Sequence, residues 1–229
     1  MFHSPAGQTA VAGSYGSPGG TGIACYGRKS LNEKKVIRVS TPLSEAAVRG
    51  LSIGDRVLIS GIVLTARDKV HKHLHDKAPA PAELPFELAG AVLYHCGPLM
   101  KEEGGRLVAV AAGPTTSHRM QMYEPSIIRS YGVRGIIGKG GMSEDGARAM
   151  REEGAVYFHA TGGAGALLAE KIKNIEGVWM LEQFGRAEAM WAFRMEDFPA
   201  VVTIDSTGAS LHDRVRRASR ERLDGFLSI

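Results

Sequence analysis

The chain has 229 residues, of which 44% are hydrophobic and 23% charged, a composition typical of a soluble globular protein with one domain or one domain and a tail. No apolar run reaches the roughly 20 residues that span a bilayer, and no uninterrupted apolar segment near the N-terminus indicates a secretory signal, so we expect a cytoplasmic protein. The net charge of +4 and the isoelectric point near 9.1 are compatible with nucleic acid, but equally with anionic small molecules or an acidic partner.

Residues 1–30 are rich in Gly, Ser, Ala and Pro and lack apolar periodicity, which predicts a flexible tail. An ordered arm that grips a partner is the alternative. From Lys35 the pattern is that of folded structure, with a strand in "KKVIRVSTP" and a short helix in "LSEAAVRGL". A long strand, or a hairpin broken at Gly61, follows in "DRVLISGIVLTARD". Two further β-rich runs are "LAGAVLYHCGP" and "RLVAVAAGPTTS".

The second half of the chain alternates helical and strand patterns. We expect a helix in "EPSIIRSYGV", a strand in "RGIIG" and a helix in "SEDGARAMREEG", with Ser143 as its N-cap and Gly154 at its end. A strand in "AVYFHA", a helix in "GALLAEKIKNI", a strand in "AVVTIDSTG" and a basic helix in "SLHDRVRRASRERLDGFLSI" follow. This order predicts a mixed α/β domain with helices on one side of a sheet.

Two segments place polar groups directly after apolar runs. "GPTTSHRM" puts three hydroxyls and an arginine just beyond a predicted strand, where ligands of α/β sheets bind: Thr115, Thr116, Ser117 and Arg119. Hydroxyls and an arginine can hold carboxylates. "GKGG" puts Lys139 between glycines and before a helix, a position that favours an anion, although the P-loop spacing is missing. Plain turns with a solvated arginine and a surface lysine are the alternatives.

Three other segments have weaker signals. In "TARDKVHKHLHD", Arg67 and Asp68 lie at a strand end and are followed by three histidines: His71, His73 and His75. His71 and His75 share a face if the segment is helical, but no third metal ligand is visible. We therefore favour a polar surface or partner contact over a metal site for these histidines. Arg67 is the better candidate, because it occupies a strand end as Arg119 does. "TGGAGALLAEKI" lacks the dinucleotide-binding spacing and indicates tight strand-to-helix packing. The arginines of residues 214–222 indicate a solvated helix face, and nucleic acid is the less favoured alternative.

Cysteine is scarce in this sequence. Cys25 and Cys96 are far apart and have no CxxC spacing. A disulfide framework is not expected, and neither is a zinc or iron–sulfur site built from this chain alone, because such sites usually take three or four ligands.

Four stretches in this order, "GDRVLISGIVLTARDKVHK", "GPTTSHRM", "GVRGIIGKGGM" and "LEQFGRAEAMWAFRMEDFPAVVTIDSTG", resemble the C-terminal domain of class I (iron–sulfur) fumarases. In two-subunit fumarate hydratases and L-tartrate dehydratases this domain is a separate β subunit. The resemblance covers roughly residues 35–213. It implies an α/β fold of the swivelling β/β/α type, a single mixed-sheet domain with helices, which we assign to residues 31–229.

The resemblance also implies a partner. An α subunit with three cysteines would hold a [4Fe–4S] cluster and supply the catalytic acid, in an α2β2 assembly, while this chain would bind no metal. The implied reaction is the reversible hydration of fumarate to L-malate, a step of the tricarboxylic acid cycle. L-tartrate or a methylated fumarate is the alternative substrate. An alternative of another class is a non-catalytic anion-binding or RNA-binding module that uses the basic C-terminal helix.

The family's site residues can be placed one at a time. Its substrate-binding arginine in "T-x-RD" falls on Arg67, and its arginine after "GPTTS" falls on Arg119. Its lysine in "GKGG" falls on Lys139. Its first hydroxyl in "GPTTS", which binds substrate and is the proposed catalytic base, falls on Thr115. A threonine hydroxyl is a weak base unless a neighbour lowers its pKa.

Overall fold

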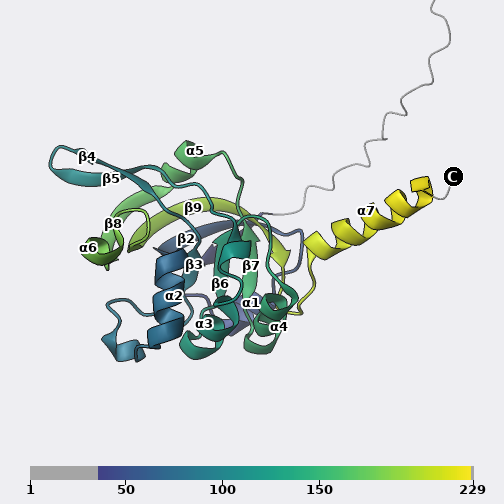
Figure 1. Ribbon diagram of the computed structural model, residues 1–229. Helices are drawn as coiled ribbons and strands as arrows, with labels where there is room; N and C mark the ends of the chain where they lie inside the picture. The colour runs from purple at the N-terminus through teal and green to yellow at the C-terminus, as the bar shows by residue number, and fades with distance from the viewer. Residues whose placement is uncertain (1–35, 228–229) are drawn as a thin grey trace, which may run out of the picture. The chain divides into compact units, whose positions relative to one another are not determined.

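The computed structural model describes residues 36–227, so the tail predicted over residues 1–30 lies outside the described residues. Its strands are β1 (Ile37–Ser40), β2 (Arg56–Thr65), β3 (Val92–Tyr94), β4 (Leu99–Glu103), β5 (Arg106–Ala111), β6 (Gly135–Gly138), β7 (Val156–His159), β8 (Ile172–Trp179) and β9 (Met190–Ile204) (Figure 1). Its α-helices are α1 (Glu45–Arg49), α2 (Asp68–Lys77), α3 (Glu124–Tyr131), α4 (Glu144–Glu153), α5 (Gly165–Ala169), α6 (Leu181–Phe184) and α7 (Leu211–Leu227). None of these helices is long and apolar enough to cross a bilayer.

The main sheet closes on itself. Its strand order is β1-β2-β3-β6-β7-β9-β8, and an additional pairing joins β2 to β9, so that β2, β3, β6, β7 and β9 form a ring. Strands β1, β2, β3, β6 and β7 run parallel, and β9 is antiparallel to its neighbours. Strand β9 is long enough to pair with β2 along one edge and with both β8 and β7 along the other. The α/β class is therefore confirmed.

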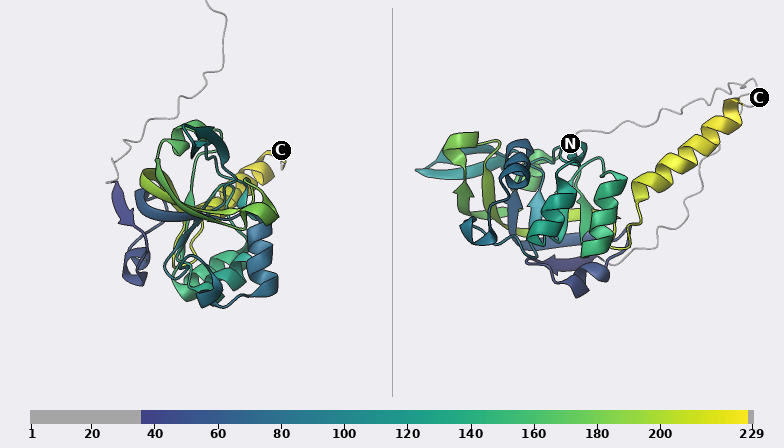
Figure 2. Two further views of the ribbon diagram at one scale, coloured as in Figure 1. Left: turned by 90° about the vertical axis from the view of Figure 1, so that its left-hand side faces the viewer. Right: turned by 60° about the horizontal axis from the view of Figure 1, so that its bottom comes forward.

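Apolar side chains fill both faces of this sheet. One cluster lies within the ring and includes Ile59, Phe158 and Phe198. The other lies on the outer face, where Leu93 and Ile136 pack against α2, α3 and α4. Figures 1 and 2 show these three helices together on one side of the sheet and α5 on the opposite side. The expectation of helices on one side holds for the three helices α2–α4 but is wrong for α1 and α5, which bury side chains in the inner cluster.

Local signals place the helix ends. Helix α4 begins at Ser143, whose Oγ accepts a hydrogen bond from the Gly146 amide at 3.3 Å, as an N-cap does. It ends at Gly154, which has a left-handed φ of 67°. Both predicted ends of this helix are confirmed.

Residues 56–65 form one strand rather than a broken hairpin. Gly61 has a φ of 106° and lies where the pairing register with β9 shifts, which marks a β-bulge. A Cβ at this position would come within 2.9 Å of the Thr41 carbonyl oxygen. The glycine therefore bends the strand without ending it.

Two expectations for the C-terminal half were wrong. The helix expected in "GALLAEKIKNI" stops at Ala169, and Ile172–Trp179 are strand β8. The strand expected in "AVVTIDSTG" is only the end of β9, which begins at Met190. In both cases pairing between β8 and β9 overrides local composition, because each supplies the other with backbone partners. Strand β4 and helix α6 were not predicted.

Candidate functional site

The carboxyl ends of three parallel strands meet at one edge of the sheet. Arg67 follows β2, His95 follows β3 and Lys139 follows β6. Ligands of α/β proteins commonly bind at such an edge. The topology therefore brings the predicted residues Arg67 and Lys139 to the same edge, although 72 positions of sequence numbering separate them.

The segment after β5 inserts between two of these strand ends. The Thr115 amide donates a hydrogen bond to the His95 carbonyl at 2.6 Å, and the Lys139 amide donates to the Thr115 carbonyl at 3.3 Å. The Ser117 amide in turn donates to the Lys139 carbonyl at 3.0 Å, and Thr116 forms an isolated parallel bridge with Lys139. The structure thus brings Thr115 and Lys139 together through direct backbone hydrogen bonds.

The two predicted arginines are joined by Asp68. Arg119 binds this carboxylate with two nitrogens: Nε lies 3.0 Å from Oδ1, and Nη2 contacts Oδ2. Arg67 Nη2 lies 3.7 Å from Asp68 Oδ2 and 3.0 Å from Glu188 Oε1. Burial alone would raise the pKa of Asp68, but the hydrogen bond and charge of Arg119, together with the charge of Arg67, lower it. Asp68 is therefore an ionised carboxylate that orients both guanidinium groups.

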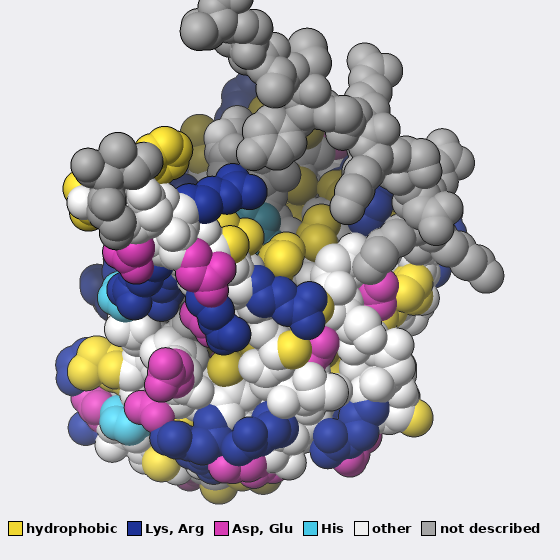
Figure 3. All heavy atoms as spheres, turned by 90° about the vertical axis from the view of Figure 1, so that its right-hand side faces the viewer, with side chains coloured by type: hydrophobic (Ala, Val, Ile, Leu, Met, Phe, Trp, Pro, Cys, Tyr) yellow, Lys and Arg dark blue, Asp and Glu magenta, His cyan; other side chains and the backbone are white. Residues whose placement is uncertain are grey.

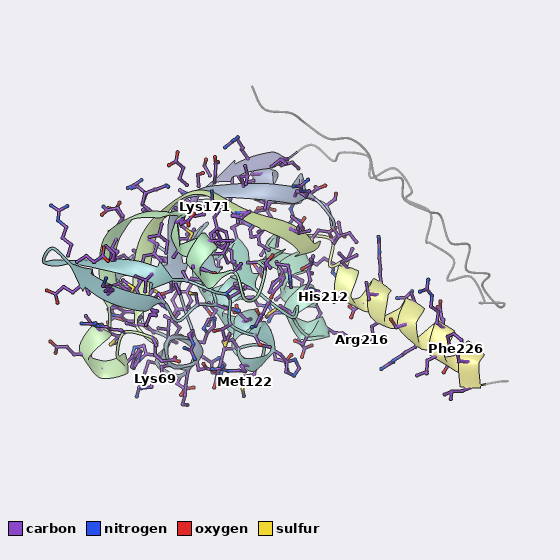
Figure 4. All side chains as sticks on the ribbon, turned by 90° about the horizontal axis from the view of Figure 1, so that it is seen from above. Lys69, Met122, Lys171, His212, Arg216 and Phe226 are labelled. Atoms are coloured by element: carbon purple, nitrogen blue, oxygen red, sulfur yellow. The ribbon has the colours of Figure 1, made fainter. Side chains whose placement is uncertain are left out.

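The charged ends of Arg67, Arg119 and Lys139 are at least partly accessible to solvent. The Arg119 side chain is 49% exposed, whereas that of Arg67 is 21% exposed and its Nε is buried without a partner among the described residues. Lys139 is partly exposed and lies against Gly162, where a Cβ would come within 3.6 Å of the lysine Nζ. Figure 4 shows Lys69 and Met122, which are close in sequence to the two arginines, on the same side of the molecule. An anion can approach these groups from solvent.

A buried cluster lies behind this edge. His71 and His95 both contact the same carboxylate oxygen, Glu124 Oε1, through their Nε2 atoms, at 2.8 and 2.5 Å. His71 Nδ1 contacts the carbonyl oxygen of Arg67 at 2.8 Å. All three side chains of His71, His95 and Glu124 are fully buried. The interpretation of His71 as a polar surface residue was therefore wrong, because α3 covers this face of α2 and supplies the carboxylate.

The cluster continues from His95 to the segment that holds Thr115. His95 Nδ1 lies 2.8 Å from Ser117 Oγ, which lies 2.7 Å from the hydroxyl of Tyr157. A Cβ at Gly138 would overlap Ser117 Oγ and come within 2.8 Å of the Tyr157 hydroxyl. Glycine at this position leaves the space in which these three polar side chains meet.

The charges of the cluster follow from its contacts. Burial favours the neutral form of His71, but the charge and hydrogen bond of Glu124 outweigh it and raise the histidine pKa. For His95 burial is the stronger effect, and its pKa is lowered. Burial raises the pKa of Glu124, but the two histidines offset this and lower it overall. These effects favour the ionised form of Glu124 and the charged form of His71, and they favour the neutral form of His95.

The described residues can be compared with the needs of a single metal ion and of an iron–sulfur cluster. The ligand atoms of His71, His95 and Glu124 lie within 4.8 Å of one another, as metal ligands do. However, both nitrogens contact the oxygen directly at hydrogen-bond distance, which leaves no space for an ion between them. An iron–sulfur cluster does not fit the described residues either. Cys96 is their single cysteine, and burial raises the pKa of its thiol to about 12.

Helix α7 has the solvated face that its arginines predicted. Its residues from Arg214 to Leu227 are all exposed, and acidic side chains stand among the arginines, as in the Arg216–Asp213 pair at 3.5 Å. Figure 3 shows the face of the molecule toward which α7 points, where Lys and Arg side chains alternate with Asp and Glu. In Figure 4, His212 lies where α7 meets the sheet and Phe226 lies near the far end of the helix.

Several residues of this edge were not predicted. Glu188, His95 and Glu124 occur singly in the sequence, and no motif or spacing marks them. Asp68 was noted at the strand end beside Arg67, but its role was not predicted, although an acid directly after a strand-end arginine can orient it. Tight strand-to-helix packing, expected in "TGGAGALLAEKI", is present: a Cβ at Gly165 would lie 3.3 Å from the Gly113 amide.

A family model and several curated proteins match this chain, and the two comparisons agree with each other. The family model described as fumarase C-terminus matches residues 21–215. A protein of Geobacillus stearothermophilus, provisionally named a class I fumarate hydratase, is 45% identical over 85% of this chain, which spans only 37% of that protein's length. A Methanocaldococcus jannaschii protein, provisionally named an L(+)-tartrate dehydratase subunit beta, is 35% identical over 82% of this chain and 96% of its own length. The L(+)-tartrate dehydratase subunit beta of Escherichia coli K12 is 32% identical, over 83% of this chain and 92% of its own.

Proposed function

This chain belongs to the fumarase C-terminus family, and from that premise we propose that it is the β subunit of a hydro-lyase that reversibly hydrates fumarate to L-malate. The observation behind the proposal is the gathering of Arg67, Arg119, Lys139 and Thr115 at one sheet edge. Three cationic side chains and one hydroxyl suit a small dicarboxylate, whose two negative charges need partners at both ends.

Each of these side chains has a proposed role. Arg67 and Arg119 bind the substrate carboxylates, with Asp68 keeping their planar groups in place until the anion arrives. Lys139 adds a point charge that stabilises the extra negative charge of an aci-carboxylate intermediate. Thr115 lies beside the Lys139 backbone and is the candidate base for the proton bound to carbon. The catalytic acid belongs to the partner subunit in this proposal.

Arg67, Arg119, Lys139 and Thr115 indicate a class of substrate, the four-carbon dicarboxylates. Relatives are named for fumarate and for L(+)-tartrate, and both are four-carbon dicarboxylates. Fumarate is the leading substrate because the relative at 45% identity is named for it. L-Tartrate and a methylated fumarate are the alternatives, and a direct assay of the three compounds separates them.

The proposal requires a partner chain. The sequence has two cysteines, and the described one is a buried thiol, so the [4Fe–4S] cluster of this proposal is held by an α subunit. Names that end in "subunit beta" are consistent with such a partner. We propose an α2β2 assembly.

The chain purified alone is expected to be colourless and inactive, because it cannot ligate the cluster that the proposal places on its partner. Co-expression with a three-cysteine α subunit encoded beside it should give a brown complex that hydrates fumarate. The measurements are the visible absorption spectrum and fumarate turnover of both preparations. An iron–sulfur band and turnover in the lone chain would refute the assignment as a β subunit.

Arg119→Lys is expected to impair the reconstituted complex although it preserves the charge. Lysine cannot reproduce the two-point contact that Arg119 makes with Asp68, nor the planar grip on a substrate carboxylate. Losing one charge-assisted contact should cost about 1.5–3 kcal/mol, roughly ten- to a hundredfold in kcat/KM. Arg129→Lys is the matched control, because Arg129 pairs with Glu152 on α4 at the surface. Equal kinetics in the two variants would remove Arg119 from the site.

A further inference from the structure

The buried cluster behind the site joins two of its parts through a continuous series of hydrogen bonds. At one end, His71 Nδ1 contacts the Arg67 carbonyl, which also accepts the His71 amide at 2.9 Å. At the other end, His95 Nδ1 contacts Ser117, two residues beyond Thr115. Glu124 Oε1 lies between the two histidines and accepts from both. A single buried carboxylate therefore connects the segment of Arg67 with the segment of Thr115.

The direction of each hydrogen bond at His71 is determined by its partners. A carbonyl oxygen and an ionised carboxylate oxygen can only accept, so both ring nitrogens of His71 donate. His71 is therefore an imidazolium with two fixed bonds, one to the Arg67 carbonyl and one to Glu124. His95 donates through Nε2 to Glu124, and in the neutral form that its burial favours, its Nδ1 accepts from the Ser117 hydroxyl.

Such a cluster is a poor source of stability. Buried charges lose their hydration, and an apolar replacement of similar volume is often as stable. Glu124 Oε2 is also buried without a hydrogen-bond partner among the described residues, which adds a further cost. What the buried cluster can supply is a fixed position for the backbone segments that it contacts. Arg67 needs such support, because it occupies the N-cap position of α2 and its side chain makes no capping hydrogen bond.

We propose that His71, Glu124 and His95 are positioning residues that fix the proposed substrate site from behind, with His71 setting the Arg67 backbone and His95 setting the Thr115–Ser117 segment. This inference rests on the proposed function for its kinetic consequence. The three residues do not touch substrate in this arrangement. They act through the two segments that do, by holding both against one carboxylate.

Two substitutions at His71 separate positioning from general stability. In His71→Asn the amide nitrogen takes the place of Nδ1 and can still donate to the Arg67 carbonyl, while the contact with Glu124 is lost. In His71→Gln the amide nitrogen takes the place of Nε2 and can still reach Glu124, while the contact with Arg67 is lost. Both variants remove the same charge, so a similar fall in Tm is expected for both.

In the reconstituted complex, His71→Gln should lower kcat/KM by at least roughly tenfold relative to His71→Asn, mostly through KM. The reason is that only His71→Gln removes the side-chain hydrogen bond to the carbonyl of the substrate-binding Arg67 and leaves that carbonyl with the His71 amide alone. Equal kinetics in the two variants, at equal Tm, would overturn the positioning role. A wild-type complex inactive on all three dicarboxylates would instead refute the proposed function. The positioning role of His71 would then be tested by an NMR measurement that needs no activity.

That measurement is NMR on the full chain labelled with 15N-histidine and 13C-arginine, and it needs no activity. At pH 8 one histidine should show protons on both ring nitrogens, and its signal should disappear in His71→Gln. The Arg67 carbonyl shift should move in His71→Gln and stay near its wild-type value in His71→Asn. Absence of a doubly protonated ring, or an Arg67 carbonyl shift that is the same in all three proteins, would overturn the inference.

Discussion

Glu124→Ala is expected to lower the free energy of unfolding by about 3–5 kcal/mol, because removing one partner of a buried ion pair leaves the other without compensation. Glu124 Oε1 accepts hydrogen bonds from His71 and His95, and all three side chains are fully buried. The substitution leaves two buried Nε2–H groups without an acceptor. For a domain of this size the fall in Tm should be roughly 6–20 °C.

Urea unfolding followed by circular dichroism measures this effect. Glu152→Ala is the matched control, because Glu152 forms an ion pair with Arg129 at 2.8 Å on the surface. An exposed pair of this kind contributes little to stability, because solvent screens it. If the two variants lost the same stability, Glu124 would not be the charged centre of a buried cluster.

Thr115→Val is expected to lower kcat of the reconstituted complex by roughly 10²–10⁴, the range typical of losing a general base. Valine keeps the shape of threonine and removes only the hydroxyl. The backbone bonds of Thr115 to His95 and Lys139 do not involve the side chain, so the segment should keep its position. KM should change little, because the arginines and the lysine remain to bind the carboxylates.

Steady-state kinetics at equal cluster content, judged by absorbance, test this expectation. Thr116→Val is the control: Thr116 is the next residue, is exposed, and has a hydroxyl of the same kind. Its kinetics should stay within about twofold of wild type. Comparable losses in both variants would assign the effect to the segment as a whole and remove the base role from Thr115.

Much of the fold was predictable wherever local signals decide it. Helix α4 has an N-cap serine and a terminal glycine, and the short strands β6 and β7 are apolar runs bounded by turns. Strand β8 was missed because "KIKNI" follows a helical pattern without a stop signal, and its partner β9 decides its conformation. Long-range pairing of this kind leaves no local mark in the sequence.

The candidate site also has a part that the sequence could predict and a part that depends on long-range packing. Arg67 and Lys139 come just after strands β2 and β6 of the main sheet, so their common edge could be expected from the order of elements. Thr115 and Arg119 come after β5, which pairs with β4 in a separate two-stranded sheet, so their place at this edge could not be expected in the same way. Their proposed roles stay predictions until the kinetics above are measured. The buried cluster could not be expected, because His71, His95 and Glu124 come from different elements and a polar residue in the sequence does not reveal its burial. Only the packing of α3 on α2 makes His71 an interior residue.

The closed sheet has a consequence for synthesis of the chain on the ribosome. Arg56 at the start of β2 pairs with Val201 near the end of β9, so the ring cannot close before nearly the whole described chain has emerged. Until then β2 has one edge unpaired, and the apolar side chains destined for the ring interior are exposed. Folding through such distant pairings is slow, and the waiting nascent chain is prone to aggregate. Because the long strand β9 completes the core so late, we expect the growing polypeptide to depend on chaperones.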